Sequence, residues 1–526
     1  MIRIDNIRLG REPDRTGLTA AAAAALGVKP DEIASVGIIR RSIDARKKSD
    51  VHYVFSLAAG LKSGKMPRGA QLYEPKSYSF PVKSIRSSRR PVVVGMGPAG
   101  LFAALMLAEA GAPPLIIERG RSVERRSGDV ESFFRTGALD LVSNVQFGEG
   151  GAGTFSDGKL ATGISDARIG FFLRKMAALG APEDIVYDSA PHVGTDVLKT
   201  VLKNAREKLL ALGCEIRFES RLSSITIENG ALASVTIEHG GEEYSIDSPL
   251  LILAPGNGAR DTFEMLHSRG VALKPKNFAV GVRIEHLQRD IDAAQYGSHG
   301  RFPPASYKIV SHAENARSVY SFCVCPGGNV IAAASEPGGA VTNGMSERAR
   351  AGENICGALL AGVTPADFPA GPLGGIEFQR KIERAAFKTG GENYFAPAQL
   401  VGDFLAHRSS KGPGKVKPSY RPGVSWCDLH EVLPDFVCRA LEEALPEFGR
   451  RIRGFDDPDA VLTAPETRSS SPVRIERGAD FCSVSARGLF PCGEGAGYAG
   501  GITSSAVDGI KCAEALALLL DANEEN

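Results

Sequence analysis

Short apolar runs separated by glycine-rich turns characterise the chain from residue 91 onward. Val-Val-Val stands at 92–94, LFAALMLAEA fills 101–110, and LIIE follows at 115–118. A short buried strand, an apolar helix that ends at Gly111 and a second strand form the pattern of a βαβ unit. The pattern therefore predicts an α/β domain with a parallel sheet.

The turn between that first strand and the helix carries a glycine spacing with a physical purpose. Gly95, Gly97 and Gly100 fit GxGxxG, and Glu118 ends the second strand. The first glycine makes the turn, the second lets the backbone approach a pyrophosphate, and the third packs the helix on the strand. The helix N-terminus then faces the phosphate charge, and Glu118 can accept hydrogen bonds from ribose hydroxyls. We predict a dinucleotide site here.

Two other segments match the same glycine spacing, at 148–153 and 495–500. Neither is followed by an apolar helix, a second strand and a terminal acid, which the fingerprint requires. The sequence therefore predicts one Rossmann unit. That unit alone does not separate NAD from FAD.

Two further strand-and-turn segments do bear on the choice of dinucleotide. LLILAPGNGAR at 250–260 reads as a buried strand that ends in Ala-Pro-Gly, and 489–520 reads as a strand, a turn with Glu494 and a long helix. Together with Glu118 they resemble the glutathione-reductase-type FAD fold, in which the C-terminal segment returns to close the flavin site. The resemblance implies FAD, with Glu494 at the ribityl chain and the helix N-terminus at the pyrimidine end of the flavin.

The motif and the resemblance together give a set of expected FAD-binding residues. They are Gly95, Gly97, Pro98, Ala99, Gly100, Glu118, Arg119, Gly150, Gly151, Ala152, Ala254, Gly256, Gly493, Glu494, Gly500, Gly501 and Ile502. We expect no metal among the cofactors.

Longer stretches extend the resemblance beyond the fold. NVQFGEGGAGTFSDGKL, FCVCPGGNV, NGMS, KPKNFAVGVRIEH and ETRSSSPVR look like a bacterial and plastid family of FAD-dependent (NAD(FAD)-utilising) dehydrogenases, and RRSIDARKK looks like its N-terminal domain. The substrate of that family is not established. The resemblance therefore implies the fold and the cofactor, and only the class of reaction.

The segment EGGAGTFSDGK, residues 149–159, stands where flavin disulfide reductases carry a redox cysteine pair. It contains no cysteine, and thiol–disulfide exchange needs thiols. We expect its glycines to let backbone amides approach the cofactor. Lys159 and His192 are weak catalytic candidates, since each is as readily explained as a structural residue.

The region after residue 270 reads as a second domain. Phe278, Val280, Val282 and Ile284 alternate with small or polar residues, which predicts a strand with one buried face, as does the run at 320–325. EVLPDFVCRALEEALPEFGRRI predicts a helix that begins at or after Pro434.

We predict an α/β fold: a glutathione-reductase-like FAD-binding domain with an inserted mixed-sheet substrate domain and a small N-terminal α+β domain. The expected boundaries are 1–88 for the basic N-terminal domain, 91–270 and 456–526 for the two parts of the FAD domain, and 271–455 for the insertion. In the N-terminal domain we expect a helix near 17–27 and two strands around RKKSD.

Charge and cysteine content indicate which partners and which cellular location to expect. Residues 1–90 hold 18 Lys and Arg against 8 Asp and Glu, although the whole chain has a net charge of only +1. We expect this basic module to dock on an acidic body, and nucleic acid is the less favoured partner. Nine scattered cysteines without a CxxC pair favour reduced thiols and a cytoplasmic protein, and no apolar run is long enough for a membrane span.

The sequence leaves three functions open. The first is an FAD-dependent oxidoreductase that passes a hydride to or from a small molecule, with transient NAD(P)H or a protein as electron donor. The second is a flavin hydroxylase, and the third is a flavin-containing binding protein that works through its basic module. Arg468 and Arg474 could hold an anionic substrate or the FAD phosphates.

Overall fold

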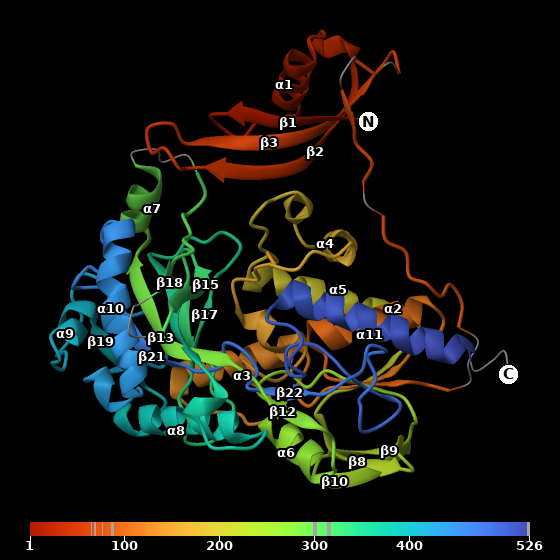
Figure 1. Ribbon diagram of the computed structural model, residues 1–526, viewed down its shortest axis with the longest axis vertical. Coiled ribbons are helices and arrows are strands. Elements are labelled where there is room, and N and C mark those ends of the chain that lie inside the picture. The colour runs from red at the N-terminus through yellow and green to blue at the C-terminus, as the bar shows by residue number, and fades with distance from the viewer. Residues whose placement is uncertain are drawn as a thin grey trace.

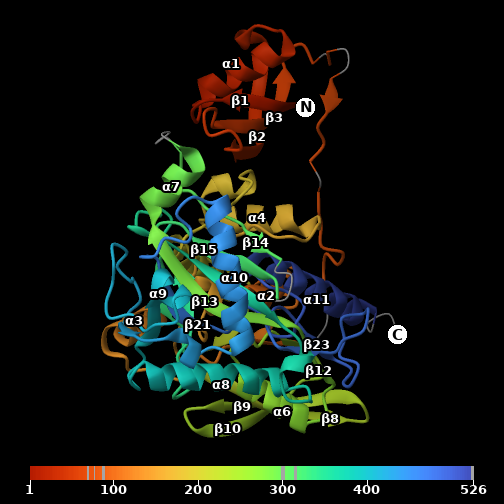
Figure 2. The ribbon, with the colours of Figure 1, turned by 60° about the vertical axis from the view of Figure 1, so that its left-hand side comes forward.

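The computed structural model describes residues 1–64, 66–67, 70–75, 77–85, 89–297, 302–312 and 317–522. The N-terminal sheet stands apart at one end of the molecule, and a long segment runs from it to the FAD domain (Figures 1 and 2). The predicted boundary at residue 88 lies outside the described residues. None of the helices in the described ranges is both long and apolar enough to cross a membrane.

The N-terminal domain is a four-stranded sheet with one helix packed on it. Its strand order is β2-β3-β1-β4. The elements are β1 (Ile2–Leu9), α1 (Arg15–Leu26), β2 (Ile33–Asp44), β3 (His52–Leu61) and β4 (Gln71–Leu72). Asp14 caps α1 by accepting a hydrogen bond from the backbone of Gly17, and Gly27 ends the helix at φ +68°. The predicted helix and the two strands around the basic turn are confirmed.

Arg41 and Tyr53 of the basic module contact the body. Nη2 of Arg41 lies 2.5 Å from the Asp188 carboxylate and 3.1 Å from that of Asp184. The ring centroids of Tyr53 and Phe302 are 5.2 Å apart. Part of the module's positive charge is therefore neutralised by the body, as the docking interpretation requires.

A five-stranded parallel sheet forms the centre of the FAD domain, in the order β23-β11-β5-β6-β7. Its strands are β5 (Val92–Val94), β6 (Leu115–Ile117), β7 (Glu215–Arg217), β11 (Leu251–Leu253) and β23 (Leu489–Pro491). Val93 and Ile252 pack in one core with the helices, while Val94 and Leu253 pack in another with the antiparallel sheet formed by residues 220–247. Both faces are covered, so β5, β6, β11 and β23 are apolar throughout, whereas the edge strand β7 carries Glu215 and Arg217 and is only partly buried.

Among the described residues, the other elements of this domain are six helices and a second, antiparallel sheet. They are α2 (Pro98–Glu109), α3 (Val123–Thr136), α4 (Arg168–Ala178), α5 (Thr195–Ala211), α6 (Arg260–Ser268), α11 (Ile502–Ala522), β8 (Ser220–Glu228), β9 (Ala231–His239) and β10 (Glu242–Asp247). Short 3-10 turns lie at Gly151–Phe155 and Glu183–Val186. Helices α2 and α11 pack directly on each other, which brings the two ends of the FAD domain together (Figure 1).

The substrate domain is a seven-stranded mixed sheet in the order β14-β15-β18-β13-β21-β19-β20. The strands are β13 (Phe278–Leu287), β14 (Val310–Ser311), β15 (Val319–Cys325), β18 (Asn354–Val363), β19 (Ala396–Leu400), β20 (Val424–Trp426) and β21 (Val461–Glu466). Around it lie α7 (Gln288–Tyr296), α8 (Gly374–Thr389), α9 (Val401–Leu405), α10 (Asp435–Arg451), the 3-10 turns at Pro365–Asp367 and Leu429–Glu431, and the pairs β12 (Leu273–Pro275) with β22 (Val473–Ile475) and β16 (Asn329–Ala332) with β17 (Thr342–Met345). The helix predicted after Pro434 is α10.

Three details of this domain differ from the sequence prediction. Strand β13 is buried on both faces, because β18 and β21 flank it and helices cover the sheet. A bulge after Phe322, with Cys323 at φ +41°, interrupts the expected alternation in β15. Strand β21 still pairs with β13, so the insertion extends past residue 455, where its end was predicted.

Candidate functional site

A cavity of about 330 Å³ lies where the carboxyl ends of the parallel strands meet the substrate domain. Its walls come from the turns after β5, β6 and β11, from the segment 146–161, and from the turn between β23 and α11. In open parallel sheets this edge is the usual ligand site. The fold thus brings distant parts of the chain to one place.

Most of the predicted cofactor residues line this cavity. They are Gly95, Gly97, Pro98, Ala99, Glu118, Arg119, Gly151, Ala152, Ala254, Gly256, Glu494, Gly500, Gly501 and Ile502. Gly100, Gly150 and Gly493 do not line it and pack behind it. A Cβ on Gly100 would lie 1.9 Å from the Gly95 carbonyl oxygen, and one on Gly150 would lie 2.2 Å from Thr154 Oγ1.

The first glycine turn is shaped by close backbone contacts. Gly95 has φ +93°, and a Cβ there would lie 2.1 Å from the carbonyl oxygen of Ala254. Gly97 is extended, and a Cβ there would meet only the Gly151 Cα, at 3.8 Å. Any side chain at 97 would therefore project into the cavity, directly in front of the N-terminus of α2.

Glu118 is held rigidly at the cavity wall. Its buried carboxylate accepts hydrogen bonds from the backbone amides of Met96 (2.8 Å), Gly120 (2.9 Å) and Gly148 (3.0 Å). A carboxylate offers about four acceptor positions. One position is left for a ribose hydroxyl, as the motif predicts. The neighbouring Arg119 pairs with Asp261 at 2.7 Å, so its charge is already matched.

The two weak catalytic candidates have different surroundings. Lys159 lines the cavity, and its ammonium group donates to the carbonyl oxygen of Val324. His192 is not among the lining residues and lies against Arg348, whose Nη1 donates to its carbonyl oxygen at 2.6 Å. Burial lowers the pKa of His192 to about 4. We therefore withdraw His192 as a catalytic candidate and keep Lys159.

The far end of the cavity is built by the substrate domain around an arginine that sequence reasoning missed. Arg283 is fully buried and binds Glu466 with two contacts, of 2.8 and 3.0 Å. It also donates to the Cys323 carbonyl and to Asn343 Oδ1, both at 2.7 Å. Glu466, Cys323 and Asn343 all line the cavity. The available signal was the charged Arg283 among the mostly apolar residues of this strand. A strand with one buried face would have placed that side chain in solvent.

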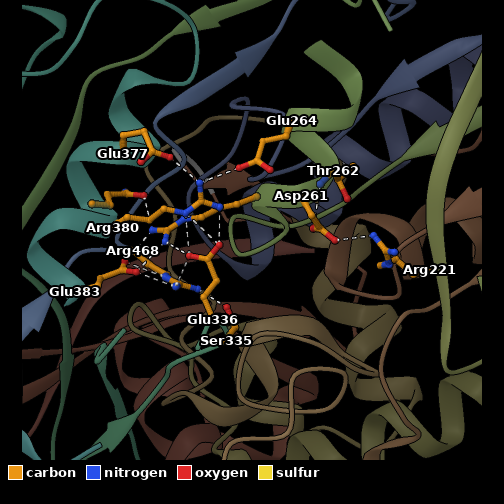
Figure 3. Close-up of polar contacts among 12 residues, drawn as sticks. Arg221, Asp261, Thr262, Glu264, Ser335, Glu336, Glu377, Arg380, Glu383 and Arg468 are labelled. Carbon is orange, nitrogen blue, oxygen red and sulfur yellow. Dashed lines mark hydrogen bonds and ion pairs between the residues drawn. The ribbon is translucent and has the colours of Figure 1, made fainter. Parts of the chain in front are cut away.

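A buried ion cluster fixes the substrate domain to the FAD domain beside the cavity (Figure 3). Arg260, in α6, lies 2.8 Å from the carboxylate of Glu383, in α8, and Arg468 approaches the same carboxylate at 3.0 Å. Burial alone would raise the pKa of Glu383, but the two guanidinium groups outweigh it and hold the pKa well below its usual range. Arg468 lines the cavity with its charge already matched, whereas Arg474 is exposed and is not among the residues that line the cavity.

Glu494 is the one acid of the C-terminal turn that lines the cavity. Burial raises the pKa of its carboxyl to about 7, and the ammonium group of Lys276 only partly offsets this. The group therefore holds a proton at pH values below about 7. A neutral carboxyl can both donate and accept hydrogen bonds, which suits a hydroxyl-bearing chain.

The raised pKa of Glu494 predicts a pH-dependent affinity for FAD. The negative pyrophosphate favours the protonated carboxyl, so affinity should fall as the pH rises above about 7, by up to about tenfold per pH unit. Glu494→Gln should show a flat profile over the same range, and the control Glu207→Gln, at an exposed helix position, should keep the wild-type slope. Fluorescence titration with FAD measures this, and a wild-type slope in Glu494→Gln would contradict the assignment.

The residues present fit a bound FAD. Gly256, Gly500 and Gly501 border open space, because a Cβ on any of them would meet no atom within 4 Å. Among the described side chains, Asn257 has a buried Oδ1 without a hydrogen-bond partner, and Asn257 lines the cavity. A buried acceptor without a hydrogen-bond partner in the wall of an open cavity is expected to bind a ligand that has hydroxyl or amino donors.

Comparison with known families identifies the class. Residues 90–262 match the FAD binding domain family, and residues 277–469 match the family described as FAD-dependent protein, C-terminal domain-like. Residues 1–59 match a domain of unknown function. The protein is therefore an FAD-dependent flavoprotein with a mixed α/β fold, and FAD is its cofactor.

The chain belongs to the same family as an uncharacterized protein of Clostridium beijerinckii. The two are 48% identical over 527 residues, which cover 98% of each chain. Among solved structures, a geranylgeranyl bacteriochlorophyll reductase-like protein from Thermoplasma acidophilum is 13% identical, with a TM-score of 0.39 over 83% of this chain and 79% of that one. The flavin-dependent brominase Bmp2 is 12% identical, with a TM-score of 0.39 over 82% and 79%. Similarity at this level carries no argument about activity.

Proposed function

We propose that this flavoprotein is an oxidoreductase that transfers a hydride to or from a small molecule, without a redox disulfide. The observation that carries the proposal is the continuity of the cavity, which runs from the glycine turns to Phe322, Cys323 and Asn343 of the substrate domain. Bound FAD supplies the redox chemistry by exchanging a hydride at its N5 atom. We place the second reactant at the end of the cavity that the substrate domain lines.

Charge in the cavity supports an anionic reactant. The N-terminus of α11 borders the cavity at Ile502, and its partial positive charge stabilises negative charge there. Asp157 is neutralised by Arg350, whose Nη2 lies 2.5 Å away. The ammonium group of Lys159 donates to the Val324 carbonyl and also interacts with the charge of Asp157. Because Arg350 already pairs with Asp157, we expect part of the Lys159 charge to be available to an anion.

The cysteines do not support a disulfide mechanism. Cys325 donates its thiol hydrogen to the carbonyl oxygen of Cys323 at 3.3 Å. The hydrogen bond with Cys325 and burial together raise the pKa of the Cys323 thiol well above its usual value. Thiolates are the reactive form, so both groups are poor partners for exchange.

The source of electrons is part of the proposal. Glutathione-reductase-type enzymes use a second Rossmann unit for NAD(P)H, but the described residues contain a single sheet in which all strands are parallel. We therefore propose transient contact with NAD(P)H, or a protein donor, in a cytoplasmic setting. The return of the C-terminal segment to the cavity agrees with a glutathione-reductase-like arrangement of the FAD domain.

An anaerobic reduction screen tests the proposal. The holoprotein is mixed with NADH, NADPH and small anionic metabolites, and the flavin absorbance near 450 nm is followed. At least one compound should bleach it, and with an anionic reductant Lys159→Met should slow the reaction about tenfold, since a contact with a charged group contributes roughly 1.5 kcal/mol. The control Lys203→Met lies on an exposed helix face and should react normally. Flavin that only dithionite reduces would instead favour the non-catalytic binding protein.

A further inference from the structure

Three metal-ligating side chains converge on the outer face of the substrate domain, away from the cavity. His407 follows α9, His430 lies in the turn Leu429–Glu431, and Glu442 is in α10. Oε1 of Glu442 lies 2.7 Å from Nε2 of His430 and 3.2 Å from Nε2 of His407. The three ligand atoms all lie within 4.8 Å of one another. None of these residues lines the FAD cavity.

The second histidine is oriented by groups behind it. Nδ1 of His430 lies 2.6 Å from Oδ1 of Asp428, and the ring stacks on Phe404 with centroids 4.6 Å apart. Histidines that bind metals almost always give their other ring nitrogen to a carboxylate or carbonyl, which fixes the tautomer. Asp428 thus leaves Nε2 of His430 as the nitrogen that faces Glu442.

The first histidine reaches the cluster through an unusual backbone conformation. His407 has φ +50°, where glycine or asparagine is more common, and its amide donates to the carbonyl oxygen of Phe404 at 3.1 Å. Its side chain is 62% exposed. The cluster is therefore open to the solvent on one side, where an ion can enter.

We propose that His407, His430 and Glu442 bind a single Zn²⁺ ion, with a water molecule in the fourth position. Two imidazoles and one carboxylate suit Zn²⁺ and the related Co²⁺, whereas Mg²⁺ and Ca²⁺ prefer oxygen ligands. Tetrahedral bonds of about 2.0–2.2 Å separate the ligand atoms by roughly 3.3–3.6 Å. The 2.7 Å separation between Glu442 and His430 must widen to this range. The exposed His407 ring stacks on His430 with centroids 4.4 Å apart and must turn so that its Nε2 faces the same point.

The ion would join three separate elements of the substrate domain. Glu442 of α10 contacts His430 in the turn Leu429–Glu431 and His407 in the segment that follows α9. A metal that binds the folded state stabilises it by mass action. We assign the ion a structural role on the face of the domain remote from the flavin.

The experiment uses the full-length holoprotein, stripped with a chelator and then dialysed against micromolar Zn²⁺. Metal content by mass spectrometry should reach one Zn²⁺ per chain, with a rise in melting temperature that Mg²⁺ does not produce. His407→Ala and Glu442→Gln should abolish both effects. His267→Ala, at an exposed histidine elsewhere, should bind normally, and Asp428→Asn should weaken binding about 10- to 100-fold, as expected for a residue that positions His430.

The outcomes separate the possible sites. Co²⁺ should give a visible absorption band that His407→Ala removes and that does not change when the flavin is reduced. The buried group Cys492, Asp508 and Cys512 is the competing site, although Asp508 already pairs with Arg477 at 2.6 Å. Zinc that remains in His407→Ala, or a chain that binds no zinc at micromolar concentration, would overturn the proposal and leave the cluster as a salt bridge.

Discussion

Gly97→Trp is expected to yield folded but colourless protein. A Cβ at this position points into the cavity, where it meets only the Gly151 Cα at 3.8 Å, so an indole would occupy the space of the pyrophosphate. Steric overlap of this kind costs about 3 kcal/mol or more, which corresponds to at least a hundredfold loss of FAD affinity. The ratio of absorbance at 450 and 280 nm after gel filtration measures the loss.

A matched substitution separates cofactor exclusion from misfolding. Gly163 is exposed in a loop, and a Cβ there would meet no atom within 4 Å, so Gly163→Trp should keep its full yellow colour. The circular dichroism spectra of both variants should resemble that of the wild type. Full flavin occupancy in Gly97→Trp would show that the pyrophosphate lies elsewhere.

Glu383→Ala is expected to lower the free energy of unfolding by about 3–5 kcal/mol. The change leaves the guanidinium groups of Arg260 and Arg468 buried without their shared carboxylate, and an uncompensated buried charge carries this cost. Glu377→Ala is the control, because Glu377 pairs with Arg380 at the exposed rim of the same cluster and should change stability by about 1 kcal/mol or less. Denaturant unfolding with far-UV circular dichroism measures both.

The lowered pKa of Glu383 determines how the stability difference between wild type and Glu383→Ala depends on pH. The folded-state pKa of Glu383 lies below its usual value of 4.5, so its stabilising contribution is fully present above about that pH and is lost as the pH falls through the folded-state pKa. The difference between wild type and Glu383→Ala should therefore shrink only in acid. A difference that is small at pH 7 would contradict the assigned role of the cluster.

The FAD domain could be predicted from the sequence because its signals are local. The glycine turn lies between the strand at 92–94 and the acid at 118, so all three are close in the chain. Each has a defined part in binding a dinucleotide. The substrate domain depends on pairs that lie far apart. Arg283 meets Glu466 and Arg260 meets Glu383, and no spacing rule links such positions.

Burial also explains where the sequence-based predictions differ from the structure. The alternation in 278–285 suggested a half-exposed strand, but Arg283 and Glu285 are both fully buried beneath neighbouring elements. His192 was a candidate because histidine titrates near neutral pH, whereas its position against Arg348 became visible only in three dimensions. Gly150 matched the glycine pattern, yet it serves packing against Thr154 and Leu202.

The central claim, that FAD is the only two-electron redox group at this site, is tested most directly by anaerobic titration with dithionite. The endpoint should be two electrons per FAD, without a long-wavelength band from a thiolate beside the flavin. Cys492 lines the cavity and lies near Cys512, but contact with that thiol and burial raise its pKa well above the usual value. An endpoint of four electrons, reduced to two by Cys492→Ser, would contradict the account and identify a redox disulfide in this pair.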